Sequence, residues 1–256
     1  MIGPPARRAL WQQLGCYARI SGATKLANSP GAIACEGVQN TPLDFARTPA
    51  VSQYFEIHPE NPQKRLVHQA VNIVREGGVI VYPTDSCYAL GCDIGNKSAM
   101  ERIRKIRRVD ANHNFTLMCR DLSDIATYSR VENATYRLLK SLTPGPYTFL
   151  LQATNEVPRR LQNPKRKTIG IRIPDNVIAQ SLLEEHGQPL MSSTLILPDH
   201  DEPMTDPYEM REVLEHFVDL VIDGGNCGFE PTTVVAIDKQ GMSIARHGKG
   251  DVDALQ

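Results

Sequence analysis

The residues best suited to phosphate chemistry form a cluster of cations in the middle of the chain. Five basic side chains lie between positions 102 and 108, and Lys105 and Arg107 form a Lys-x-Arg pair among them. Arginine supplies paired N–H donors and lysine a point charge, so such a pair can neutralise a polyphosphate. The alternative is a solvated basic helix face, which is the usual reason for a charge run. Because a helix cannot aim five cations one way, we expect two of them at the surface.

Two segments rich in hydroxyl groups accompany this cluster. Thr84 and Ser86 follow an apolar strand expected at 79–82, and open α/β sheets bind ligands at the carboxyl ends of strands. The alternative is an ordinary turn whose polar side chains bond to their own backbone. A second run of hydroxyls lies in the strand expected at 190–195 and comprises Ser192, Ser193 and Thr194.

The composition limits the possible classes of protein. The chain has 28 basic and 29 acidic residues and a formal charge of −1, so any contact with a nucleic acid must come from local clusters. The 6 cysteines and 7 histidines show no zinc spacing, and we expect reduced thiols, no protein-bound metal and a cytoplasmic location. We also expect no membrane partner, because no apolar run approaches the length of a membrane-spanning helix.

Residues 1–50 differ from the remainder of the chain. They are rich in Gly, Ser, Asn and Pro, and their acidic residues are Glu36 and Asp44. We expect a disordered or non-native leader there, with a transit peptide as the alternative. The folded domain is expected over residues 51–256.

From Val51 onward, apolar strands alternate with helices, which is typical of a layered α/β fold. Periodicity predicts strands at 54–57, 79–82, 115–119, 147–152, 168–173, 190–195, 220–223, 233–237 and 243–246. One helix is expected from Asn61 to a stop at Gly77-Gly78, and a second is expected to begin at a Ser98 cap and to carry the basic cluster. Further helices are expected at 122–128, 134–142, 176–185 and 207–218.

Five segments resemble the YrdC-domain family, which makes threonylcarbamoyl-adenylate for tRNA modification, and they are most similar to its YciO-like branch. They are residues 82–92, 105–107, 142–148, 168–174 and 230–235. The resemblance covers about four-fifths of the chain, from Val51 to the C-terminus. It implies an α/β fold with a twisted, mixed, open sheet, flanked by helices and holding a concave basic cavity.

The resemblance also implies roles for individual residues. Lys105 and Arg107 would hold the phosphates of ATP, and Ser193 would complete the catalytic set. The substrate- and nucleotide-binding residues would be Thr84, Ser86, Tyr88, Thr148, Arg172, Ser192, Thr194 and Arg246. Alternation along 171–173 places Arg172 opposite its apolar neighbours, although a surface position at the sheet edge is the alternative. Thr148, Thr232 and Thr233 suit a cavity lining and ordinary strand packing equally well.

The implied reaction joins ATP, bicarbonate and L-threonine to give threonylcarbamoyl-AMP and pyrophosphate. Mg²⁺ would arrive with ATP and not in a protein cage. The alternative is a nucleotide-binding paralogue, with ATP or AMP as ligand, that has lost efficient synthesis. Leu195 stands where the family has Asn and Asn176 where it has His, and these differences favour the alternative. Either protein could be a monomer or a homodimer.

A second basic stretch, at residues 159–167, could provide a surface for binding nucleic acid. The family is associated with binding of double-stranded RNA. Basic side chains can bind the phosphates of such a duplex and recognise its A-form shape without reading its sequence. We therefore predict double-stranded RNA or tRNA as a possible partner, with a merely solvated loop as the alternative. The candidate RNA-binding residues are Arg108, Arg159, Arg160, Lys165, Arg166 and Lys167.

Overall fold

The computed structural model describes residues 51–110, 113–238 and 241–255. All of them belong to one compact unit, Pro49–Gln256. The leader expected over residues 1–50 lies outside the described residues. In the described part of the chain, no helix has the length and apolar character needed to cross a membrane.

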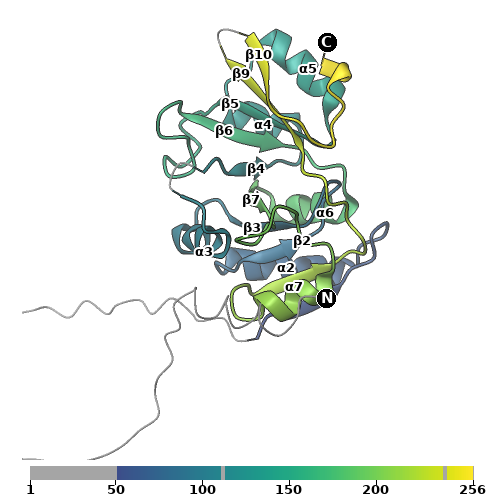
Figure 1. The fold of residues 1–256 in the computed structure, drawn as a ribbon. Helices are drawn as coiled ribbons and strands as arrows, with labels where there is room; N and C mark the ends of the chain where they lie inside the picture. Colours follow the sequence, from purple (N-terminus) through teal and green to yellow (C-terminus); the bar gives the residue numbers. More distant parts are fainter. Residues whose placement is uncertain (1–50, 111–112, 239–240, 256) are drawn as a thin grey trace, which may run out of the picture. The chain divides into compact units, whose positions relative to one another are not determined.

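The elements of this unit alternate between strands and helices along most of the chain (Figure 1). In chain order they are β1 Gln53–Glu56, α2 Lys64–Arg75, β2 Ile80–Tyr82, β3 Ala89–Asp93, α3 Lys97–Arg107, β4 Thr116–Met118, α4 Leu122–Tyr128, α5 Asn133–Leu142, β5 Tyr147–Gln152, β6 Thr168–Arg172, α6 Val177–His186, β7 Leu190–Thr194, α7 Pro207–Leu214, β8 Leu220–Asp223, β9 Thr233–Asp238, β10 Gly241–Arg246 and a final 3₁₀ turn at Asp253–Leu255.

Among the described residues, ten strands form one sheet in the order β1-β8-β2-β3-β7-β4-β6-β5-β9-β10. The β1–β8, β8–β2, β4–β6 and β5–β9 pairs are parallel, and the other neighbours are antiparallel. The mixed sheet implied by the family resemblance is therefore confirmed.

Each face of the sheet carries its own apolar core, because successive side chains of a strand point to opposite faces. On β2 and the residue before it, Val79 and Val81 belong to one core, whereas Ile80 and Tyr82 belong to the other. Helices α3, α4, α5 and α7 contribute buried side chains to the first core, and α2 and α6 contribute to the second. The sheet thus lies between two helical layers.

The second layer covers only part of its face in the described unit. The strand residues packed with α2 and α6 come from β8, β2, β3, β7 and β4. Strands β6, β5 and β9 contribute none to that core, and Figure 1 shows them toward the opposite end of the sheet from α2. The uncovered part of this face is where a ligand can reach the sheet.

Two local predictions were wrong. No strand was predicted at Ala89–Asp93, yet β3 forms there and pairs on both sides, with β2 and with β7. Ser98 does not cap α3. Asn96 does, since its Oδ1 accepts a hydrogen bond from the Ala99 amide at 2.9 Å, and Asn is as good a cap as Ser.

Candidate functional site

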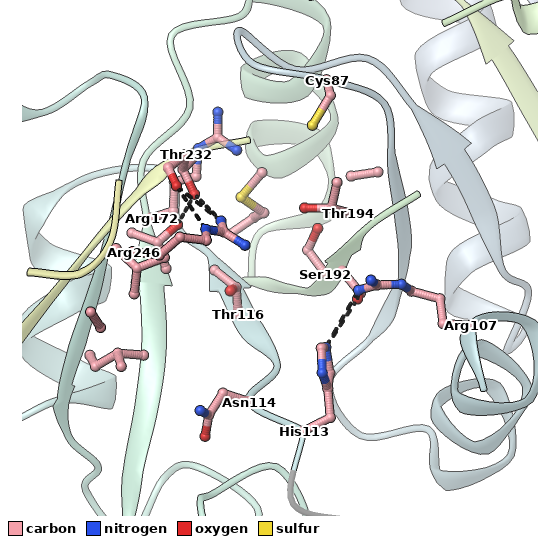
Figure 2. Close-up of a pocket in the computed structure, with 17 residues that line it drawn as sticks. Cys87, Arg107, His113, Asn114, Thr116, Arg172, Ser192, Thr194, Thr232 and Arg246 are labelled. Carbon is pink, nitrogen blue, oxygen red and sulfur yellow. Dashed lines mark hydrogen bonds between the residues drawn. The ribbon is translucent and has the colours of Figure 1, made fainter. Parts of the chain in front are cut away.

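A cavity of about 280 Å³ lies against the uncovered part of the sheet (Figure 2). This volume is near the lower end of small-molecule sites. The lining comes from seven strands, from the end of α3 and from the segments before β3, β4 and β9. Its residues are Cys87, Ala89, Arg107, His113, Asn114, Thr116, Met118, Thr148, Leu150, Arg172, Ser192, Ser193, Thr194, Thr232, Val234, Ala245 and Arg246.

A glycine on β6 lies beside the cavity, on the same face of the strand as Arg172. On β6, Gly170 alternates with Ile169 and Ile171, which are buried in the first core. A Cβ atom at Gly170 would lie 2.9 Å from Oγ1 of Thr116 on the adjacent strand, so a larger side chain would clash with that strand. Glycine at this position therefore allows β6 and β4 to pack closely beside the cavity.

One wall of the cavity is built around Arg107 at the end of α3. Its Nη1 donates a hydrogen bond to Oγ of Ser193 at 2.6 Å, and its Nε donates to the Ile196 carbonyl at 3.4 Å. Nearby on β7, Ser192 accepts a hydrogen bond from the buried Tyr82 hydroxyl at 2.8 Å. These bonds fix both the cation and the hydroxyl row of β7.

The opposite wall is built around Arg246 at the end of β10. Its Nη2 donates to the Thr232 carbonyl at 2.9 Å, and the Thr232 hydroxyl lies 2.8 Å from the Thr148 hydroxyl. Figure 2 shows Arg246 and Thr232 on one side of the cavity and Arg107 with His113 on the other. A ligand in the cavity would therefore have a guanidinium group on each side.

The third arginine of the cavity is already paired. Nη2 of Arg172 lies 2.5 Å from Oδ1 of Asp85, which belongs to the turn after β2. Of the described residues, no aspartate or glutamate lines the cavity itself. The site thus combines three guanidinium groups, one of which is paired with the Asp85 carboxylate.

The electrostatics of the cavity follow from this imbalance. Burial lowers the pKa of Arg107, and the neighbouring Arg246 lowers it further. Burial likewise lowers the pKa of Arg246, and Arg172 adds to the effect. A bound anion would relieve the repulsion between these neighbouring cations. Burial raises the pKa of the Cys87 thiol, which favours its protonated form.

Eight of the residues considered for the cavity from the sequence meet in it: Arg107, Thr148, Arg172, Ser192, Ser193, Thr194, Thr232 and Arg246. Lys105 does not line it, and its side chain is exposed on α3. Lys105 and Arg107 are two positions apart on α3, and two positions correspond to about 200° of rotation around a helix. The two side chains therefore point in different directions. Its phosphate role stays a prediction.

Thr84, Ser86 and Tyr88 are buried beside the cavity and bond within the protein. The Thr84 hydroxyl donates to the Cys87 carbonyl at 2.6 Å and accepts from the Ser86 and Cys87 amides. The Tyr88 hydroxyl donates to the Gly225 carbonyl at 2.7 Å. These contacts give all three a structural role in shaping the turn, and ligand contact by them stays a prediction.

The candidate RNA-binding residues are not alike. Arg160 donates to the Ile94 and Gly95 carbonyls, at 3.0 and 2.5 Å, and so ties its loop to the end of β3. Arg108 lies 3.5 Å from the Asp199 carboxylate. The remaining candidates, Arg159, Lys165, Arg166 and Lys167, are exposed.

The two departures from the family pattern also have structural roles here. The Leu195 side chain is fully buried in the first core. Asn176 caps α6, because its Oδ1 accepts a hydrogen bond from the Ala179 amide at 3.0 Å.

Sequence reasoning missed three polar residues of the lining. His113, Asn114 and Thr116 follow the basic cluster and lead into β4. The histidines were assessed for metal spacing, whereas the usable signal was a polar His-Asn pair next to a strand and close to Arg107. Within the described ranges, no group of three or more His, Cys, Asp and Glu side chains could hold a metal ion.

Comparison with known proteins agrees with this fold and cavity. Residues 72–248 match the Sua5/YciO/YrdC family model, which is described as "Telomere recombination". The chain belongs to the Sua5/YciO/YrdC family.

Three relatives place the chain within that family. It is 57% identical to Escherichia coli (strain K12) YciO over 202 residues, which cover 79% of this chain and 98% of YciO. A crystal structure of E. coli YciO superposes with a TM-score of 0.78 and covers 80% of this chain and all of that one. The threonylcarbamoyl-AMP synthase of Nitrosococcus oceani is 35% identical over 129 residues, 50% of this chain and 69% of the synthase. P. abyssi Sua5, crystallised with L-threonine, shares the fold with a TM-score of 0.74 at 21% identity, over 80% of this chain and 60% of Sua5.

Proposed function

We propose that the cavity binds ATP through its phosphates and joins it with bicarbonate and L-threonine to give threonylcarbamoyl-AMP and pyrophosphate. The observation that carries this proposal is the set of Arg107, Arg172 and Arg246 around one cavity whose described lining contains no aspartate or glutamate. The product would be the activated donor for threonylcarbamoyladenosine modification of tRNA.

The chemistry needs fixed cations more than it needs a base. A carbamate oxygen of N-carboxylated threonine attacks the α-phosphorus of ATP, the bond from that phosphorus to the bridging oxygen breaks, and pyrophosphate leaves. Negative charge builds on the equatorial oxygens and on the leaving group. Arg107 and Arg246, held on opposite walls by hydrogen bonds to Ser193 and Thr232, are placed to stabilise that charge without reorganising. Mg²⁺ would enter with ATP.

The relatives support both the synthase reaction and the use of L-threonine as a substrate. A synthase of this activity matches half of the chain at 35% identity. A structural relative that shares the fold binds L-threonine. The hydroxyl groups of Ser192, Thr194 and Thr148 supply the neutral donors and acceptors that an amino acid beside a phosphate requires.

A pyrophosphate-release assay tests the reaction. The expected result is release that requires ATP, bicarbonate and L-threonine together, and that falls at least about 100-fold in Arg246→Ala, the usual loss when a transition-state charge stabiliser is removed. Arg120→Ala is the matched control, since Arg120 pairs with Asp121 at the surface. Wild-type protein that binds ATP but releases no pyrophosphate would contradict the synthase.

The second candidate is a nucleotide-binding protein without efficient synthesis, with duplex RNA as a further ligand. Two observations favour it: Leu195 puts an apolar, fully buried side chain at the family's Asn position, and Lys105 is exposed outside the cavity. ATP or AMP binding without turnover would select this candidate over the first.

A further inference from the structure

His113 lies beside a cationic group, the guanidinium of Arg107, and beside the hydroxyl group of Ser193. It lies in the segment between α3 and β4 and lines the cavity. Its Nε2 is 3.5 Å from the Ser193 hydroxyl and 3.5 Å from Nη1 of Arg107. The ring packs edge-on against the buried Phe115 ring, with centroids 5.2 Å apart and planes at 78°, so its orientation is fixed.

Burial, helped by the neighbouring cations, favours the neutral form of the ring. Burial and Arg107 lower the pKa of His113 to about 4, with Arg104 and Arg246 acting in the same direction and Asp110 against them. At neutral pH the imidazole therefore has one N–H donor and one acceptor nitrogen.

The direction of the hydrogen bonds decides which nitrogen is the acceptor. Arg107 can only donate, and its Nη1 donates to the Ser193 oxygen at 2.6 Å. The Ser193 hydroxyl keeps its own proton to donate, and Nε2 of His113 is an acceptor within reach. Nη1 of Arg107, which can only donate, is also 3.5 Å from Nε2, and a donor at that distance favours an unprotonated Nε2 with the ring proton on Nδ1.

We propose that His113 is a positioning residue of the cavity: its Nε2 accepts a hydrogen bond from Ser193 and so orients Ser193 and Arg107 together toward a bound anion. The choice of residue has an electrostatic reason. An aspartate or glutamate would also accept this hydrogen bond, but it would neutralise Arg107, as Asp85 offsets Arg172. A neutral imidazole holds the arginine while leaving its charge available to a phosphate or carboxylate. The role toward a bound anion rests on the proposed function. The direction of the hydrogen bond between Ser193 and His113 is independent of that function.

The direction of the bond is tested without any ligand. In protein labelled with ¹⁵N at histidine, the ring nitrogens of His113 at pH 7 should report a protonated Nδ1 and an unprotonated Nε2. Ser193→Ala should alter the Nε2 signal, whereas His58→Ala, at an exposed turn outside the cavity, should not. A protonated Nε2 in the wild-type protein would overturn the proposal whether or not the protein binds nucleotide.

The role toward an anion is tested by calorimetric titration with ATP. His113→Ala should weaken binding about fivefold to tenfold, the effect of one neutral hydrogen bond. His113→Gln, which restores an acceptor without charge, should stay within about threefold of wild type, and His113→Glu should bind at least as weakly as His113→Ala.

A double-mutant cycle shows whether His113 acts through Ser193. Because the two residues share one hydrogen-bonded unit, Ser193→Ala combined with His113→Ala should cost no more than Ser193→Ala alone. Additive losses, or a Glu variant that binds as well as the Gln variant, would overturn the positioning role. If the wild-type protein binds no ATP, the proposed function fails, and the ¹⁵N result still decides the role of His113.

Discussion

Arg172 on β6 and Asp85 in the turn after β2 form a buried ion pair beside the cavity, with Nη2 2.5 Å from Oδ1 and side chains that are 7% and 11% exposed. The pair joins two segments 87 residues apart in the chain. It fixes the turn against the sheet, and it makes Arg172 the least available of the three cavity arginines.

Breaking this pair should destabilise the fold. Arg172→Ala leaves the Asp85 carboxylate buried without its cation, and we expect the free energy of unfolding to fall by about 3 kcal/mol. Urea denaturation measures the change. Arg120→Ala, which breaks an exposed pair, should cost at most about 1 kcal/mol. Equal losses in the two variants would show that the Arg172–Asp85 pair is effectively solvated.

Restoring the family asparagine at position 195 should harm the protein. Leu195 is fully buried in an apolar core, so Leu195→Asn would bury an amide and lose apolar packing, at a cost of about 3 kcal/mol. Leu195→Met, which conserves volume, should cost less than about 1.5 kcal/mol. Thermal and urea unfolding compare the two, and an Asn variant as stable as the Met variant would mean that position 195 reaches polar surroundings.

His113 should make stability depend on pH. Its folded-state pKa is about 4 and its unfolded value about 6.5, so the unfolded chain binds a proton that the folded chain does not between these values. Stability is therefore lost as the pH falls from about 6.5 toward 4. Burial also lowers the pKa of His186, so the comparison is with His113→Gln, which keeps His186. Urea denaturation should show that the free energy of unfolding falls more between pH 7 and pH 5 in the wild type than in His113→Gln. Equal losses in the two proteins would contradict a neutral His113 ring in the folded state.

The exposed cations of the β5–β6 loop should contribute to RNA binding. Lys165→Ala with Arg166→Ala should weaken duplex-RNA binding and reduce the slope of log K against log salt by roughly 2, about one unit for each lost phosphate contact. Filter binding at several salt concentrations measures this. The matched control is Lys64→Ala with Arg65→Ala, which removes the same charge from α2. Identical slopes in the two double variants would favour the solvated-loop alternative.

Sequence patterns predicted most elements because the apolar periodicity is strong where strands and helices are buried. Helix α4 and strand β5 have the predicted bounds. Strand β3 was missed because Gly91 and Cys92 in a loop-like motif carry no alternation. It was harder to predict which side chains share a cavity, because this depends on how the helices and strands are oriented in the folded structure.

Arg107 and Lys105 illustrate that difficulty. They are neighbours in the motif, yet only Arg107 lines the cavity, because the helix turns Lys105 toward solvent. His113 was missed for a related reason. Its relevance comes from Ser193, 80 residues later in the chain, and no local pattern connects the two.

The central claim is that the guanidinium groups of this cavity bind a polyphosphate, and calorimetric titration with ATP tests it most directly. We predict saturable binding to the wild type that weakens at least about tenfold in Arg107→Ala and in Arg246→Ala, since each removes charge-assisted hydrogen bonds. Lys105→Ala, measured alongside, should cost less than Arg107→Ala because its side chain is exposed outside the cavity. Absence of saturable ATP binding to the wild type, or unchanged affinity in both arginine variants, would contradict the account.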